Sequence, residues 1–235
     1  MQPFDSIVVN MKTNSKNQPL QTNDGSEVNI AQIRARVWIL LAVDACDRAG
    51  LLPIGKTRFH RIIFLSNCLA ELYQATPPAK RVLKYKRGPF YPDVQWQLDR
   101  LTAMSLVKIT NLTIAKDHYG PWMDADYLIT KDGIATAATI RRTPLGNATG
   151  SYIDELVFAF ARLDTRSLDQ LALSELNYAA SGIAEGALIT FEDANSNLAI
   201  RKAADFQRVA PEALTNRIRE QVQLYLRYLE KQEAA

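Results

Sequence analysis

The chain has 235 residues, of which 47% are hydrophobic and 23% are charged, and its formal net charge is +3. This composition is ordinary for a globular protein, and the low net charge excludes a polycation that binds nucleic acid along its whole length. Two cysteines, Cys46 and Cys68, exclude a disulfide scaffold, and they show no metal-binding spacing. We expect both to be reduced core residues of a cytoplasmic protein.

Residues 1–29 are predicted to form a flexible N-terminal leader, because residues 10–29 are polar and rich in turn-forming residues. They do not have the composition of a signal peptide. The longest apolar run, residues 37–43, is far too short to span a membrane, so we expect no membrane contact.

Three helices are predicted next. The first covers residues 30–49 and is apolar on nearly every side between 37 and 43, so we expect it to be buried. After a break, a second helix with one apolar face covers residues 57–74. The third begins at Pro92, because proline suits the first helical position, where its missing N–H has no partner to lose. Its core stripe consists of Val94, Leu98 and Leu101.

The hydrophobic period then changes from helix to strand. Residues 106–115 and 126–130 alternate between polar and apolar, with a slip near Asn111, and residues 116–125 between them are predicted to form the hairpin tip. A further helix follows at 131–142, and Thr130 is predicted to cap its start. Three helices, a two-stranded wing and another helix are the order of a winged helix-turn-helix, so we predict a mainly α fold with a small β wing and a winged-helix domain at residues 30–144.

Residues 145–235 are predicted to form a C-terminal helical region, with residues 145–150 as a linker before it. Ser167 and Gln170 have the spacing of a capping box. A last helix is predicted from Pro211 to about Lys231. The apolar stripe of this helix would fit either the chain's own core or a groove in a partner. We take the helix as a candidate partner helix, with the stripe Leu214, Ile218, Val222, Tyr225 and Leu229.

Residues 50–57 match the nucleotide-binding pattern GxxxxGK[ST] letter for letter. A phosphate-binding loop needs a buried strand before its first glycine, and here a predicted helix precedes Gly50. The loop is also apolar, and Pro53 has no amide hydrogen to offer a phosphate. We therefore interpret the string as a turn between two helices and keep a P-loop enzyme only as a third hypothesis.

Other catalytic or metal-binding sets are not evident in the sequence. The two histidines, His60 and His118, have no matching partners for a catalytic triad, so each is interpreted as a satisfied or surface residue. We predict no catalytic residue, no cofactor and no metal, and hence a protein that is not an enzyme.

The strongest candidate for a functional surface is a basic run before the third helix, together with the outer face of that helix. A winged helix usually presents its third helix to DNA while the wing touches phosphates. Asp93 and Asp99 on the outward face favour a protein partner over DNA. The residues predicted to form this DNA or partner surface are Lys80, Arg81, Lys84, Lys86, Arg87, Gln95, Trp96 and Arg100.

Five sequence blocks occur in a distinctive order: GLLPI at 50–54, FHRIIFL at 59–65, VLK at 82–84, GPFYPDVQ at 88–95 and LDRL at 98–101. This series, within about residues 30 to 140, resembles the middle components of bacterial ABC-type three-component systems. The small subunit of Lamassu-type anti-phage systems is similar. The Gly-Pro-Phe element alone is less specific, since Panacea-type antitoxin domains carry a similar one.

The resemblance implies a non-catalytic adaptor that links an SMC-like, Rad50-like ABC ATPase to an effector, often a nuclease, in an anti-phage or anti-plasmid defence complex. Double-stranded DNA would be a further partner within that complex, and ATP would be held by the ATPase. The alternative is a winged-helix DNA-binding transcriptional regulator or antitoxin, which the winged pattern and the basic run also suit.

Overall fold

The structure, a computed structural model, groups the chain into two compact units, residues 1–33 and 34–235. In the first unit, β1 (Leu20–Gln21) pairs antiparallel with β2 (Glu27–Val28). The rest of the predicted leader lies outside the described residues. The structure describes residues 20–21, 27–28, 30–73, 75, 79, 81–180, 182–190, 197–209 and 218–233.

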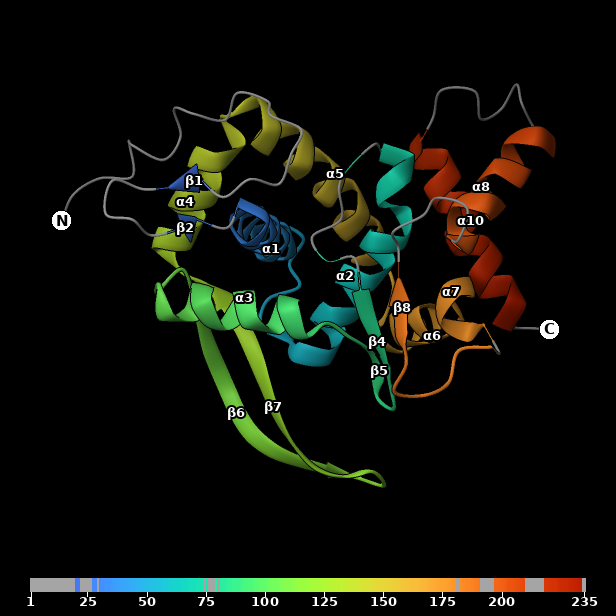
Figure 1. Ribbon diagram of the computed structural model, residues 1–235, viewed down its shortest axis with the longest axis horizontal. Helices are drawn as coiled ribbons and strands as arrows, with labels where there is room; N and C mark the ends of the chain where they lie inside the picture. Colours follow the sequence, from blue (N-terminus) through green and yellow to red (C-terminus); the bar gives the residue numbers. More distant parts are fainter. Residues whose placement is uncertain are drawn as a thin grey trace. The chain divides into compact units, whose positions relative to one another are not determined.

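The unit 34–235 is mostly helical and carries two small antiparallel sheets, which confirms a mainly α fold with a small β part (Figure 1). Helix α1 (Ile30–Arg48) is buried throughout from Trp38 to Cys46, as its apolar sequence predicted. Helix α2 (Lys56–Leu69) continues into a 3-10 turn, η2 (Ala70–Tyr73). Its apolar face packs into the same core cluster as α1.

One sheet has the strand order β3–β7–β6. Its strands are β3 (Ile54–Gly55), β6 (Val107–Asp117) and β7 (Gly120–Ile129). The β6–β7 register shifts between Thr110 and Thr113, and Asn111 has a positive φ of 50°. This β-bulge confirms the slip that the sequence predicted. The predicted tip at 116–125 was too long, because both strands continue almost to a two-residue turn.

Helices α3 (Pro92–Ala103) and α4 (Lys131–Arg141) flank this hairpin in the sequence. Pro92 occupies the start of α3 as predicted. Thr130 caps α4, because its hydroxyl oxygen accepts the amide hydrogen of Gly133 at 3.0 Å. Local signals therefore located both helix starts correctly.

The second sheet has the order β5–β4–β8 and joins distant parts of the chain. Its strands are β4 (Arg81–Tyr85), β5 (Gly88–Phe90) and β8 (Leu188–Thr190). Val82 of β4 lies opposite Ile189 of β8. The sequence did not predict β8, because a three-residue strand has too few positions to show a period.

The C-terminal part is formed by five described helices: α5 (Pro144–Phe160), α6 (Thr165–Ser174), α7 (Leu176–Ala179), α8 (Leu198–Val209) and α10 (Ile218–Glu233). The predicted linker at 145–150 was wrong, since these residues form the first turns of α5. Thr143 caps that helix and Pro144 suits its first position. Residues 34–235 thus group as one unit that spans the predicted boundary at 144, and the division into domains stays a prediction.

The N-terminus of α6 also differs from the prediction. Its cap is Asp164, whose carboxylate accepts the amide hydrogen of Ser167 at 2.7 Å, rather than Ser167 itself. The predicted start of the last helix at Pro211 lies outside the described residues.

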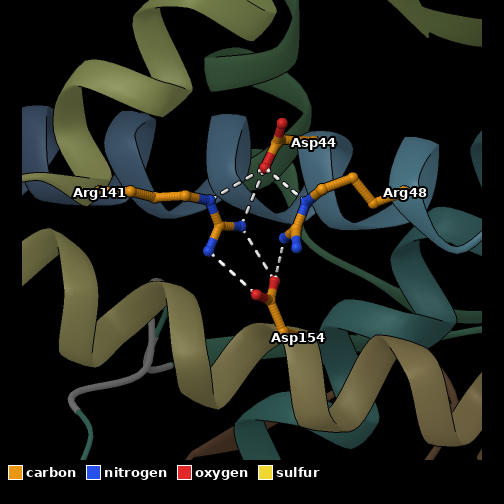
Figure 2. Close-up of polar contacts among 4 residues, drawn as sticks. All are labelled: Asp44, Arg48, Arg141 and Asp154. Carbon is orange, nitrogen blue, oxygen red and sulfur yellow. Dashed lines mark hydrogen bonds and ion pairs between the residues drawn. The ribbon is translucent and has the colours of Figure 1, made fainter.

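Four charged side chains join α1, α4 and α5 (Figure 2). Asp44 on α1, which is 7% exposed, accepts hydrogen bonds from Arg48 at 3.2 Å and Arg141 at 3.0 Å. Asp154 on α5 accepts two hydrogen bonds from Arg141, at 2.9 and 3.1 Å, and also contacts Arg48. Two positive and two negative groups balance at this junction, so the three helices meet without an unpaired buried charge.

Candidate functional site

The basic run does not form a free positive edge. Lys80 lies outside the described residues, and Arg81 is exposed on β4. The Nζ of Lys84 donates to the carbonyl oxygen of Ala180 at 3.4 Å and lies 5.4 Å from the centre of the Tyr178 ring. Strand β4 ends at Tyr85, so Lys86 and Arg87 lie in the turn between β4 and β5.

Arg87 fastens the β4–β5 turn to the tip of the β6–β7 hairpin. Its Nε and one terminal nitrogen donate to both carboxylate oxygens of Asp117, at 2.7 and 2.8 Å. The guanidinium also donates to the carbonyl oxygen of Gly120 and lies 5.3 Å from the Trp122 ring centre. The Arg87 guanidinium lowers the pKa of Asp117 to about 2, so the pair stays charged at neutral pH.

Lys86 makes a second contact with the same tip. Its Nζ donates to the carbonyl oxygen of Tyr119 at 3.2 Å and lies 5.1 Å from the centre of that ring. Lys86 and Arg87 therefore position the hairpin, and their positive charges are shared with groups of the protein itself.

The predicted residues on α3 differ in exposure: two point outward and one is half-buried. Trp96 is 54% exposed, and the exposed Arg100 guanidinium lies 5.1 Å from its ring centre. Gln95 is half-buried and serves the interior, because its amide nitrogen donates to the Tyr127 hydroxyl at 2.9 Å. Its amide oxygen lies 3.3 Å from Nε2 of His60. Only Trp96 and Arg100 of this set are presented outward.

The β6–β7 hairpin carries an exposed apolar face that sequence reasoning missed. Ile114 and Met123 lie directly opposite each other and are 81% and 62% exposed. Met123 shares a strand face with the buried Tyr127, because residues an even number apart on a strand point the same way. Figure 1 shows the hairpin extending beyond α3. We define the apolar wing face as Ile109, Leu112, Ile114 and Met123.

A signal for this face was present in the sequence. The alternation at 106–115 continues past Val107, which is buried, to Leu112 and Ile114, which are exposed. An alternating pattern shows that one face is apolar, but it does not show where the body of the protein stops covering that face. Exposed apolar patches on a folded protein mark contact sites.

The structure supports a turn between helices at the GxxxxGK[ST] match. Helix α1 precedes Gly50, and only the two-residue strand β3 separates the turn from α2. The Nζ of Lys56 donates to the carbonyl oxygen of Met123 at 3.1 Å. The lysine of the string is thus directed to β7, and the loop lacks the strand that a phosphate-binding loop follows.

The two histidines occupy different environments. His60 is 1% exposed, and its Nδ1 accepts the amide hydrogen of Tyr91 at 3.2 Å. Burial lowers its pKa to about 4, so the ring is neutral and has partners for both nitrogens, as the sequence suggested. His118 lies at the exposed hairpin tip beside Tyr119.

The described residues contain neither a metal-binding cluster nor a membrane-spanning helix. In this part of the chain, no group of three or more His, Cys, Asp and Glu side chains could hold a metal ion. No helix among the same residues is both long and apolar enough to cross a bilayer.

The last helix packs into the chain's own core. Val222, Tyr225 and Leu229 are buried, and α10 packs against α6 and α8. The prediction of a partner helix was therefore wrong for these three residues, and the alternative of core packing holds. Leu214 and the side chain of Ile218 lie outside the described residues.

No model of a protein family matches this sequence, and no curated protein matches it either.

Proposed function

We propose that this chain is a non-catalytic, winged-helix adaptor that docks on a partner protein through its wing. Its partners would be an SMC/Rad50-like ABC ATPase and an effector, a nuclease, within a cytoplasmic bacterial defence complex against phages or plasmids. The ordered sequence blocks between Gly50 and Leu101 support the choice of partners, since they resemble the adaptors of such systems.

The element order supports the winged-helix part of the proposal. Helix α1, strand β3, helices α2 and α3, and the hairpin β6–β7 follow one another, and β3 pairs with the last strand of the hairpin. The β4–β5 hairpin between α2 and α3 is an addition to that plan. In this arrangement α3 and the wing would form the contacting surface.

The observation that carries the docking proposal is the apolar wing face. Ile114 is 81% exposed, and Leu112 and Met123 are each at least 60% exposed. Burying one such side chain contributes about 1.5–3 kcal/mol, so a partner that covers all three would gain several kcal/mol. A phosphate backbone offers no comparable gain, because its charged surface needs cations rather than apolar groups.

The charged residues on the same surface also favour a protein partner. Asp93 and Asp99 are exposed on α3, where they oppose an approaching phosphate. Arg87 of the basic run is held by Asp117. These features favour a protein over DNA as the partner of this surface.

A DNA-binding regulator or antitoxin is the second candidate, because Lys108 and Lys116 are exposed on β6. A wing with such lysines could contact phosphates. That function requires sequence-selective binding to the promoter of its own gene at physiological salt. A gel-shift titration against the promoter and a scrambled duplex distinguishes it, since equal affinity for both would exclude a sequence-specific regulator.

The adaptor proposal is tested by co-expression with any SMC-like ATPase that is found encoded beside this gene. We expect the wild-type chain to co-purify with it, and Ile114→Asp to reduce the retained ATPase at least tenfold, because a carboxylate would be desolvated in the interface. Leu145→Asp is the matched control, since Leu145 is 55% exposed on α5 rather than on the wing. Failure of the wild-type chain to retain the ATPase would overturn the proposal.

A further inference from the structure

A pocket of about 500 Å³ lies on the opposite face of the wing from the apolar one. Its walls come from the N-terminal turn of α2, the β4–β5 turn, the hairpin tip and α6. Trp122 and Asp124 of β7 line it, and they alternate with Met123, which belongs to the apolar wing face. This volume lies within the range of about 300–1,000 Å³ that is typical of small-molecule sites.

Four cationic side chains converge on this pocket: Arg58, Arg61, Lys86 and Arg87. Three carboxylates line it as well, and two of these are already paired. Asp117 binds Arg87, and Asp169 contacts Arg61. Asp124 is the third and opposes part of the positive charge, and Lys86 already donates to the Tyr119 carbonyl, so the cation most available to a ligand is Arg58.

Arg58 is the cation with the least satisfied side chain. Its guanidinium makes no hydrogen bond or ion pair with any described residue, and its Nε is buried without a partner. The Nε of Arg61, one turn further along α2, is likewise buried without a hydrogen bond to described residues. Both Nε atoms are covered by the protein itself, so an anion in the pocket would be bound by the terminal nitrogens of Arg58, which are not covered.

The helix itself adds positive potential at the same place. Gly55, Thr57 and Arg58 line the pocket, and they form the N-terminus of α2. Gly55 has no side chain to accept the free amide hydrogens, and the first turn contains no acidic residue. The helix terminus adds partial positive charge to the pocket, and the Asp126 carboxylate beside Gly55 offsets part of it.

We propose that this pocket binds the phosphate group of a nucleotide, either free or at the end of a nucleic-acid strand. The phosphate lies against Arg58 and the first turn of α2. The base lies against the aromatic side chains of Tyr119 and Trp122, which offer an apolar surface that any base can cover. An inorganic phosphate alone would fill only a small part of the volume.

This site is independent of the proposed docking function. It uses the polar face of the wing, whereas docking uses the apolar face. It also differs from a Walker-type site, because Lys56 is directed to the Met123 carbonyl and the binding groups are arginines from α2.

The test measures binding to the full chain by calorimetry and by tryptophan fluorescence, since Trp122 lines the pocket. The probes are AMP, adenosine, and one single-stranded DNA oligonucleotide with and without a 5′-phosphate. We expect at least one phosphorylated probe to bind at least tenfold more tightly than its unphosphorylated counterpart. AMP binding without a preference between the oligonucleotides identifies a free nucleotide, and a preference for the phosphorylated strand identifies a strand end.

Two variants locate the binding. Arg58→Gln should weaken it about tenfold or more, as expected for loss of a charge-assisted contact, whereas Arg58→Lys should retain part of it. Arg162→Gln, which removes an equal charge from an exposed position after α5, should leave binding unchanged. Thermal melting of each variant establishes that it is folded, and Lys86→Gln replaces Arg58→Gln if the latter does not fold.

Three results would overturn the proposal. They are the absence of binding by both phosphorylated probes at millimolar concentration, equal binding with and without the phosphate for both pairs, and equal losses in the pocket variant and in Arg162→Gln.

Discussion

His60 shows how one side chain links α2 to α3 and the turn before it. The Tyr91 amide donates to its Nδ1, so Nε2 carries the hydrogen and lies 3.3 Å from the Gln95 oxygen. Its ring also stacks on that of Tyr91, with an interplanar angle of 10°. Protonation would replace the accepted hydrogen bond with a clash of two donors, in a site that excludes water.

The stability of the protein should therefore depend on pH through His60. Its pKa falls from 6.5 in the unfolded chain to about 4 in the folded protein. Between these values the unfolded chain binds the proton and the folded protein does not. The stability that neutral His60 contributes to the fold is therefore fully present above about pH 6.5, and it is lost progressively as the pH falls towards 4.

We predict that lowering the pH from 7 to 4.5 reduces the free energy of unfolding by about 2 kcal/mol through this histidine. The measurement is urea unfolding at both pH values, for the wild type and for His60→Gln. The variant should be less stable at pH 7 but should lose less stability on acidification. Other groups titrate in both proteins, so the difference isolates His60, and identical pH dependence in the two would contradict the prediction.

Among the elements, the short helix α7 is the junction between the C-terminal helices and α2. Glu175 at its start is fully buried and accepts hydrogen bonds from the amide of Asn177 at 2.9 Å and the Tyr225 hydroxyl of α10 at 2.8 Å. Asn197, just before α8, donates to the carbonyl oxygen of Cys68 on α2 at 2.9 Å. Burial raises the pKa of Glu175, and these donors oppose that rise.

Removing one donor from this junction should destabilise the fold. Tyr225→Phe keeps the ring but removes the hydroxyl, and we expect a loss of about 1–3 kcal/mol because the buried Glu175 Oε1 loses one of its two donors and keeps only the Asn177 amide. Urea unfolding measures the loss. Leu224→Ala on the exposed side of the same helix should change stability by no more than about 0.5 kcal/mol, and an equal effect of both changes would show that the hydroxyl is unimportant.

At the scale of the whole molecule, residues 145–235 complete structures that begin before residue 144. Strand β8 covers the edge of β4, and Tyr152 of α5 contacts the carbonyl oxygen of Ser66 in α2. One core cluster contains buried residues from both parts, including Phe64 and Phe160. The N-terminal part alone would expose an unpaired strand edge and much of this apolar surface.

We predict that the full chain unfolds in one cooperative transition and that a fragment of residues 1–144 does not fold cooperatively. Circular dichroism and differential scanning calorimetry of both proteins measure this. A sharp thermal transition of the fragment with native helical content would instead support a separate winged-helix domain at 30–144.

Local patterns in the sequence determined the positions of most helices and of the long hairpin. Apolar periodicity located α1, α2 and α3, and Pro92 and Thr130 marked two helix starts, because each signal acts within a few residues. The bulge at Asn111 was visible for the same reason. Helix periodicity also placed Trp96 and Arg100 on the outer face of α3.

The partners of side chains far apart in the sequence were decided only by the tertiary structure. Arg87 binds Asp117, which lies thirty residues further along the chain. The basic run was predicted to be a free positive edge, and this contact instead attaches it to the tip of the wing. The stripe on α10 was apolar in either interpretation, and only the packing of α6 and α8 showed what covers it. Sequence periodicity records which face of an element is apolar, but the coverage of that face depends on where the rest of the chain lies.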